Sequence, residues 1–179
     1  PQKNAGHIEV RSVNPEKVQD LFEKAFARDT EHASGAYRQF FPYIQDRKIM
    51  QWGGLADEFD EWERRYGVTL ELLKYFDAID YPLSFSTKAA WWTEDERYMS
   101  LFRKHTHNWH VKISIITADD RKAKLMEKGV PSSTERLQAI KNLASAGVHV
   151  TLRLRPFIIG VSNDWKELVN KAAAAGADS

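Results

Sequence analysis

Residues that could contact a ligand stand at the ends of two predicted strands. Gly53 and Gly54 follow a short extended run, and Lys88 follows another run, directly after Ser86 and Thr87. Glycine lets a ligand approach the backbone closely, and a lysine can neutralise a carboxylate or a phosphate. The structural alternatives are a tight turn without a ligand, which we favour for the glycines taken alone, and a solvated lysine at the start of a loop.

Two further candidate positions lie on later strands. Ser114 carries a hydroxyl that needs a partner if its face of the strand is buried, and a backbone acceptor would satisfy it. Arg153 and Arg155 share one face of the last predicted strand if that strand stays regular. Burying the charge of an arginine near the carboxyl edge of the sheet costs free energy unless the side chain forms an ion pair or binds a ligand. Ligand contact and a structural ion pair therefore both stay open for Arg153.

Two polar clusters have plainer explanations. His105, His107 and His110 form the run HTHNWH, which spans a predicted helix-to-strand junction and fits no standard zinc spacing. We therefore expect surface or loop histidines and no metal ligands. The acidic segment DEFDEWE, residues 57–63, could hold a cation, but a solvated helix face is the default expectation.

Four extended runs alternate with helical patterns along the chain. They begin near Ile49, Leu83, Val111 and Val148, and helical sequence separates each pair. This alternation is typical of βαβ units in a parallel sheet, so the predicted fold class is α/β. Right-handed crossovers place the carboxyl ends of all strands at one edge, where such folds bind ligands. The candidate residues should therefore lie near one another.

Local signals mark where several helices begin. Asn14 and Pro15 predict the start of the first helix, because one can cap free amides and the other suits the first turn. Capping boxes are expected at residues 93–96 and 132–135. The acidic segment leads into one helical pattern before the second strand.

Composition excludes several classes of protein. The chain has 179 residues, of which 42% are hydrophobic, and it has 26 basic residues, 25 acidic residues and no cysteine. These values describe one globular domain and exclude disorder. No apolar run approaches the roughly 18 residues of a membrane span and no secretory signal is present, so we expect a cytoplasmic protein without a membrane partner. Without cysteine, this chain cannot form disulfides or hold an iron–sulfur cluster by itself.

Three segments together resemble the radical S-adenosylmethionine (SAM) superfamily, and most closely the branch of spore photoproduct lyase and related DNA repair photolyases. Residues 127–164 are similar to that branch's Pro-Ser-x-x-Glu-Arg-Leu helix, Ala-Gly turn, strand and following loop. RKIMQWGGLADEF, residues 47–59, resembles the second barrel strand, and YPLSFSTKAAW, residues 81–91, resembles the third. The resemblance implies a partial (β/α) barrel, with a helical lead-in over residues 1–47 and βα repeats over residues 48–179.

The resemblance also implies a SAM site. By its motifs, Gly53 and Gly54 would receive the amino group of SAM, and Lys88 would meet the methionyl carboxylate. The parent reaction would be one-electron reductive cleavage of SAM at a [4Fe–4S] cluster, which gives a 5′-deoxyadenosyl radical.

The later strands would complete that site. Ser114 resembles a contact to the ribose and methionyl region, and Arg153 with Pro156 corresponds to the motif that borders the adenine and the methionyl end. The resemblance assigns no catalytic residue and no oligomeric state. It implies SAM as the small-molecule partner and a damaged pyrimidine dimer as a nucleic-acid substrate, although no basic stripe with interleaved aromatics is present.

One defining feature of the family is missing. The Cys-x3-Cys-x2-Cys loop that holds the cluster follows the first barrel strand in the family, and this chain has no cysteine. We therefore expect that strand and loop to lie upstream of Pro1, and we expect this chain alone to be inactive.

Two other functions stay open. A metal-independent (β/α) barrel that binds a phosphorylated metabolite would need a glycine-rich phosphate loop, and the loop RPFIIGVSND offers only Gly160. A non-catalytic binding domain that lost its cysteines is the other. No nucleophile-elbow serine, Walker loop or GxGxxG motif is present, so the hydrolase, P-loop and dinucleotide-binding classes find no support.

Overall fold

A four-stranded parallel sheet forms the centre of the computed structural model, which describes residues 13–32, 34–54 and 56–178. Its strands are β1 (Met50–Gln51), β2 (Leu83–Thr87), β3 (Trp109–Ser114) and β4 (His149–Arg153). The strand order is β1-β2-β3-β4, and every neighbouring pair is parallel. The predicted α/β class is therefore confirmed.

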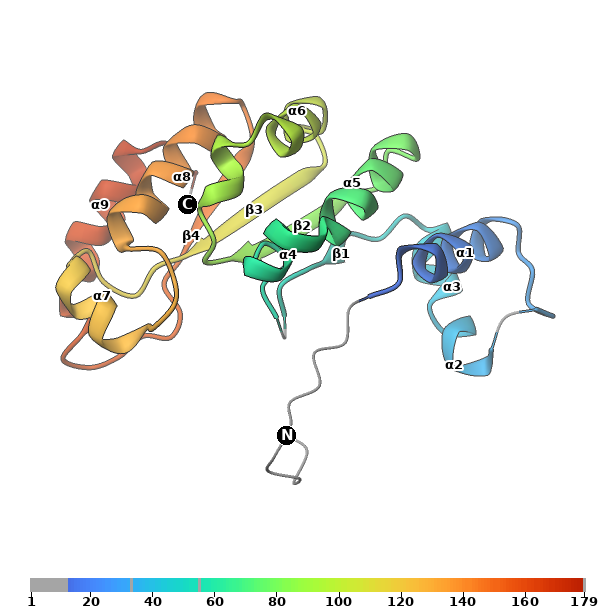
Figure 1. Ribbon diagram of the computed structural model, residues 1–179, viewed down its shortest axis with the longest axis horizontal. Coiled ribbons are helices and arrows are strands. Elements are labelled where there is room, and N and C mark those ends of the chain that lie inside the picture. Colours follow the sequence, from blue (N-terminus) through green and yellow to red (C-terminus); the bar gives the residue numbers. More distant parts are fainter. Residues whose placement is uncertain (1–12, 33, 55, 179) are drawn as a thin grey trace, which may run out of the picture.

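Helices precede and connect these strands. Before β1 the chain forms α1 (Pro15–Phe26), α2 (Gly35–Arg38) and α3 (Phe41–Gln45). The connections contain α4 (Glu61–Tyr66), α5 (Val68–Ala78), the 3-10 helix η1 (Trp91–Glu94), α6 (Glu96–Lys104), α7 (Asp120–Met126) and α8 (Ser133–Ser145). After β4 come η2 (Ser162–Asp164) and α9 (Trp165–Ala174). Figure 1 shows an arched molecule, with α1, α2 and α3 at the β1 end and α7, α8 and α9 at the β4 end.

One face of the sheet forms the hydrophobic core. It carries apolar side chains that are at most 1% exposed: Phe85, Trp109, Val111, Ile113 and Val150. The helical lead-in joins the same core, because the Phe22 ring lies 5.0 Å from that of Phe76 and 4.9 Å from that of Tyr81. Helices α1 and α3 therefore pack onto the βα repeats.

The opposite face of the sheet is polar. His110 is hydrogen-bonded to Thr151 (2.8 Å), and Lys112 donates to the side chain of Gln51 (2.8 Å). The strand register places Ser86 on this same face. In a doubly wound sheet helices cover both faces and the strands are apolar throughout. Four strands do not close a barrel, so the partial barrel stays a prediction.

Local signals confirm two predicted helix starts and correct one. Asn14 caps α1 by accepting from the amide of Lys17 (3.2 Å), and the capping box of Ser132 and Glu135 opens α8. The box predicted at residues 93–96 is wrong. Residue 93 lies in η1, and Asp95 caps α6 instead, because the turn after β2 delays the start of that helix.

The helical pattern between β1 and β2 is broken in the structure. Gly67, at φ +67°, ends α4 and precedes α5, and the carboxylate of Glu63 accepts from the amides of Thr69 (2.7 Å) and Leu70 (2.9 Å) at the start of α5. The acid that was expected on a solvated face therefore caps a buried helix end. Helix α7 was not predicted.

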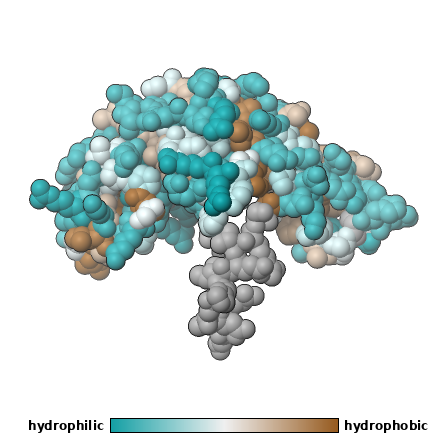
Figure 2. Space-filling model, viewed as in Figure 1, coloured by the Kyte–Doolittle hydropathy of each residue, from teal (hydrophilic) through white to brown (hydrophobic). Residues whose placement is uncertain are grey.

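Hydrophilic residues predominate on the surface seen in Figure 2, and hydrophobic residues gather there in small patches. Within the described ranges, no helix combines the length and the apolar character needed to cross a bilayer.

Candidate functional site

The first strand end requires a glycine at one position only. Gly53 has φ +80°, and a Cβ there would lie 2.0 Å from the carbonyl oxygen of Ser86 and 2.6 Å from Oε2 of Glu58. A Cβ at Gly54 would meet nothing within 4 Å, and its φ is not positive. Close packing of β1 against β2 therefore explains Gly53 without a ligand, and a ligand role for either glycine stays a prediction.

Glu58 lies beside this strand end with an unpartnered carboxyl group. Both carboxyl oxygens are buried, and neither makes a hydrogen bond to any described residue. Burial raises the pKa of Glu58 to about 8 against the weaker opposing effect of nearby backbone amides, and the charge of Asp57 acts in the same direction as burial. The group is therefore mostly protonated at pH 7, and a cation placed beside it would ionise it.

The other acids of residues 57–63 have structural partners. Asp57 accepts from the hydroxyl of Thr87 (2.6 Å) and from the amide of Lys88 (2.7 Å), and it thereby ties the loop after β1 to the end of β2. Asp60 caps α4, and Glu63, 5% exposed, caps α5. The expected solvated helix face is wrong for these residues but correct for Glu61, whose side chain is 80% exposed. Glu58 stands apart because it has no hydrogen-bond partner among the described residues.

Lys88, whose side chain is 36% exposed, belongs to an otherwise buried ion network at the ends of β2 and β3. Its Nζ lies 2.7 Å from Glu127 Oε1, and Arg136 Nη2 lies 2.8 Å from Glu127 Oε2. Arg136 is fully buried, and its Nη1 donates to the carbonyl of Ser114 (2.8 Å). Burial favours a neutral Glu127, but the hydrogen bonds and charges of Lys88 and Arg136 outweigh it and hold the pKa below its usual range. Two cations against one carboxylate leave this network with a net charge of +1.

Arg153 occupies the polar face close to the first strand end. Its Nη1 donates to the hydroxyl of Ser86 (2.5 Å), and no carboxylate of the described residues forms an ion pair with it. The structural ion pair considered for Arg153 is therefore not formed. Arg155 follows the end of β4 and is exposed, so the two arginines do not continue a common strand face.

The structure thus brings the candidate residues together in two groups at the carboxyl edge. Gly53, Glu58 and Arg153 surround Ser86, whereas Lys88 and Ser114 belong to the ion network. The candidate proline, Pro156, is exposed and has no hydrogen bond or ion pair to either group within the described chain.

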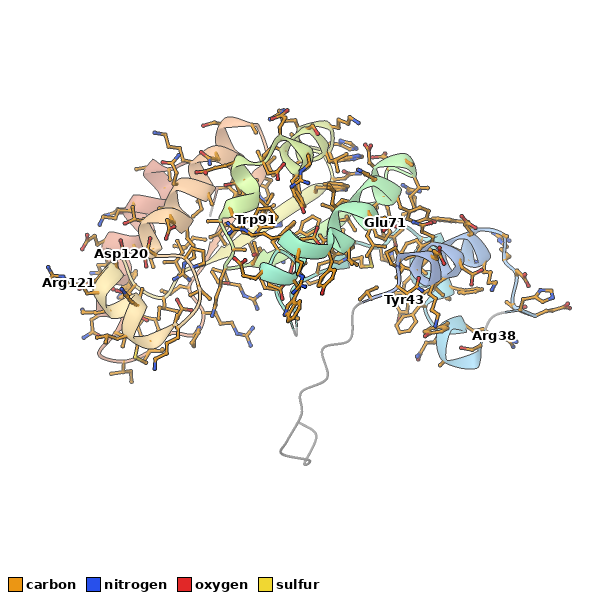
Figure 3. The ribbon with its side chains drawn as sticks, in the orientation of Figure 1. Arg38, Tyr43, Glu71, Trp91, Asp120 and Arg121 are labelled. Atoms are coloured by element: carbon orange, nitrogen blue, oxygen red, sulfur yellow. The ribbon has the colours of Figure 1, made fainter. Side chains whose placement is uncertain are left out.

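A cleft of about 330 Å³ opens beside the second group. It lies between the loops after β1 and β2 and the loop before α8, and its lining includes Asp57, Arg64, Lys88 and Trp91. Figure 3 shows Trp91 beside α4, and Arg64 lies over its ring at 4.9 Å. The first group lies outside this lining. The cleft could therefore admit a part of a ligand that extends past Lys88.

Sequence reasoning missed three residues of this edge. Glu58 was grouped with a solvated helix face, although its position four residues after Gly54 places it near the strand end. Glu127 and Arg136 were read only as parts of a motif. Their pairing joins residues on α8 and after α7, and no local pattern reports such a contact.

The stability of the protein should depend on pH through Glu58. The folded state holds a proton up to about pH 8, whereas the unfolded chain releases it near pH 4.5, so stability falls as the pH rises between these values. Glu58→Gln removes this pH dependence, because glutamine does not ionise. The free energy of unfolding of the variant, relative to that of the wild type, should therefore increase by about 1.4 kcal/mol for each pH unit between roughly 5 and 7. Urea unfolding at three pH values measures it, and a pH-independent difference would contradict the burial argument.

The residues present differ in how well they fit the two cofactors that the resemblance implies. Iron–sulfur clusters are held mainly by cysteine thiolates, and the chain has none, so no step through a cluster can be assigned to these residues. The amino and carboxylate groups of SAM suit the acid and the arginine around Ser86. A comparison of the chain with models of protein families and with curated proteins finds no match.

Proposed function

We propose that this chain binds the methionyl end of SAM at the carboxyl edge of its sheet, with Glu58 facing the amino group and Arg153 the carboxylate. We further propose that it is part of a radical SAM enzyme whose cluster ligands lie outside these 179 residues. The observation that carries the proposal is a buried carboxyl group beside Gly53, on the same edge as Arg153. Within the part of the chain that the structure describes, the carboxyl group has no hydrogen-bond partner and the arginine has no acidic partner.

Opposite charges explain why such a site would suit an amino acid. An ammonium group beside Glu58 would favour its ionised form and relieve the cost of burying that form alone. A guanidinium binds a carboxylate through two hydrogen bonds, and Ser86 would hold Arg153 in place for it. Lys88 is the second cation near this edge, although Glu127 already pairs with it.

The same acid separates this proposal from its main alternative. A phosphorylated metabolite would be attracted by Arg153 and by the positive ion network, but its negative charge would keep Glu58 protonated, whereas an ammonium group would favour the ionised form. Bound SAM supplies a radical only after reduction, and the residues described here would bind and orient it. That chemistry implies a reducing compartment, so a cytoplasmic location belongs to the proposal. The polar second face supports the partial barrel, because a barrel interior need not be apolar.

Calorimetric titration of the 179-residue chain tests the proposal. We expect SAM to bind, and we expect Glu58→Gln, Arg153→Gln and Lys88→Ala each to weaken the affinity by about tenfold, the loss typical of one charged contact. At pH 7, binding should release close to one proton as Glu58 ionises, which titrations in two buffers of different ionisation enthalpy would measure.

The control is Lys141→Ala on the exposed side of α8, which should leave the affinity unchanged. Unchanged affinity for Lys88→Ala would remove that lysine from the site. Binding of ribose 5-phosphate but not SAM, without proton release and unchanged in Glu58→Gln, would replace the proposal by the phosphate alternative.

A further inference from the structure

The opposite edge of the sheet carries a second cluster of chemically active side chains. Asp80 lies in the turn before β2, and His105 and His107 lie in the turn before β3. Asp80 Oδ1 is 3.2 Å from His105 Nδ1 and 3.2 Å from His107 Nε2. These three atoms lie within 4.8 Å of one another. His105 lies in a turn, as the expectation of surface or loop histidines allows, but its side chain is buried and only 5% exposed.

His105 is held in one orientation. Its ring stacks on Trp109, with centroids 4.3 Å apart, and its Nε2 lies 2.8 Å from Asp77 Oδ1. Lys104 pairs with the other carboxyl oxygen of Asp77 at 3.2 Å, so the 2.8 Å contact is a hydrogen bond in which His105 Nε2 donates to the Asp77 carboxylate. In the neutral ring Nδ1 then carries the lone pair.

That lone pair has no hydrogen-bond partner. His105 Nδ1 is buried, and it makes no hydrogen bond to the described residues, although Asp80 Oδ1 lies 3.2 Å away. Two acceptors, an imidazole lone pair and a carboxylate oxygen, thus face each other at 3.2 Å. A cation between them would satisfy both. A carboxylate behind a histidine is also the arrangement that orients histidine ligands in metal sites.

We propose that Asp80, His105 and His107 bind a Zn²⁺ ion at the amino-terminal edge of the sheet. Ligands at about 2.0–2.1 Å in tetrahedral geometry stand roughly 3.3 Å apart, close to the spacing of both nitrogen–oxygen pairs. Two imidazoles and a carboxylate are donors that zinc accepts, and water would fill the fourth position.

The neighbouring groups are compatible with this ion. Asn108 donates to Asp80 Oδ1 (2.9 Å) and so orients the carboxylate, while Lys104 pairs with Asp77 (3.2 Å). His107 is exposed, and its proton can move to its other nitrogen when Nε2 binds the metal. The ion would join the α5–β2 and α6–β3 turns, far along the strands from the carboxyl edge. Its role would therefore be structural, and it is independent of the proposed SAM site.

Zinc titration of the tag-free chain after chelator treatment tests the site. We expect one Zn²⁺ per chain, a raised thermal midpoint on binding, and a visible Co²⁺ spectrum typical of four-coordinate nitrogen and oxygen ligation. His107→Ala and Asp80→Asn should weaken Zn²⁺ affinity by at least about tenfold, and Asp77→Asn should weaken it by about 10- to 100-fold through His105. Because Asp80 and His107 are exposed, their variants should fold.

The matched control is His32→Ala, which removes another exposed histidine that pairs with an aspartate, Asp29, at 2.9 Å. It should leave the affinity unchanged. The proposal is overturned if the chain binds no Zn²⁺, or if His107→Ala and Asp80→Asn bind it as the wild type does. A doubly protonated His105 bridging Asp77 and Asp80 would give the first result, and ring-nitrogen chemical shifts would identify it.

Discussion

Gly53→Ala should destabilise the protein by about 3 to 5 kcal/mol, whereas Gly54→Ala should change its stability by less than about 0.5 kcal/mol. The new methyl group at Gly53 would lie 2.0 Å from the Ser86 carbonyl oxygen, and its φ of +80° is unfavourable for alanine. Backbone of two hydrogen-bonded strands surrounds this position, so the overlap cannot be relieved by turning a side chain. Urea unfolding of both variants measures the difference.

The two variants isolate the effect of the local backbone and its neighbours, because the same substitution is made at two adjacent glycines. At Gly54 the added methyl group enters open space, and no positive φ opposes it. Equal effects at the two positions would mean that β1 does not approach β2 as described. A large effect on SAM binding in Gly54→Ala, with unchanged stability, would instead assign that glycine to the ligand.

Arg136→Met should lower the free energy of unfolding by about 3 to 5 kcal/mol, the range observed when one partner of a buried ion pair is removed. The substitution leaves Glu127 buried with only Lys88 as its partner, and it removes the donor to the Ser114 carbonyl. Denaturant unfolding at pH 7 measures this loss. A cost below 1 kcal/mol, on the order of a surface ion pair, would contradict the described burial.

Two further variants separate charge from packing at this network. Arg121→Met, on the exposed side of α7 and labelled in Figure 3, should be neutral within about 0.5 kcal/mol. Arg136→Met combined with Glu127→Gln should be less destabilised than Arg136→Met alone, because the second change removes a buried charge that has lost one of its two partners. If the losses of stability caused by Arg136→Met and by Glu127→Gln simply add in the double variant, the guanidinium stabilises the protein through packing and not through its charge.

Features that depend on a few neighbouring residues could be predicted from the sequence. The alternation of extended and helical patterns predicted the parallel sheet, and the capping residues Asn14 and Ser132 marked two helix starts. The residues at 93–96 failed as a cap because a 3-10 turn after β2 shifts the start of α6 to Asp95. Local propensity indicates that a helix forms nearby, but competing turns decide where it begins.

Residue types and their order determined by themselves that this protein is an α/β domain without thiolate chemistry, whose candidate ligands stand at strand ends. Only the tertiary structure decided which of them meet. It paired Lys88 with Glu127, buried His105 against Asp77, and gave Glu58 and Arg153 no charged partner among the residues it describes. These contacts join residues distant in sequence, and burial in the folded protein decides the charge state of Glu58. Neither property can be read from neighbouring residues.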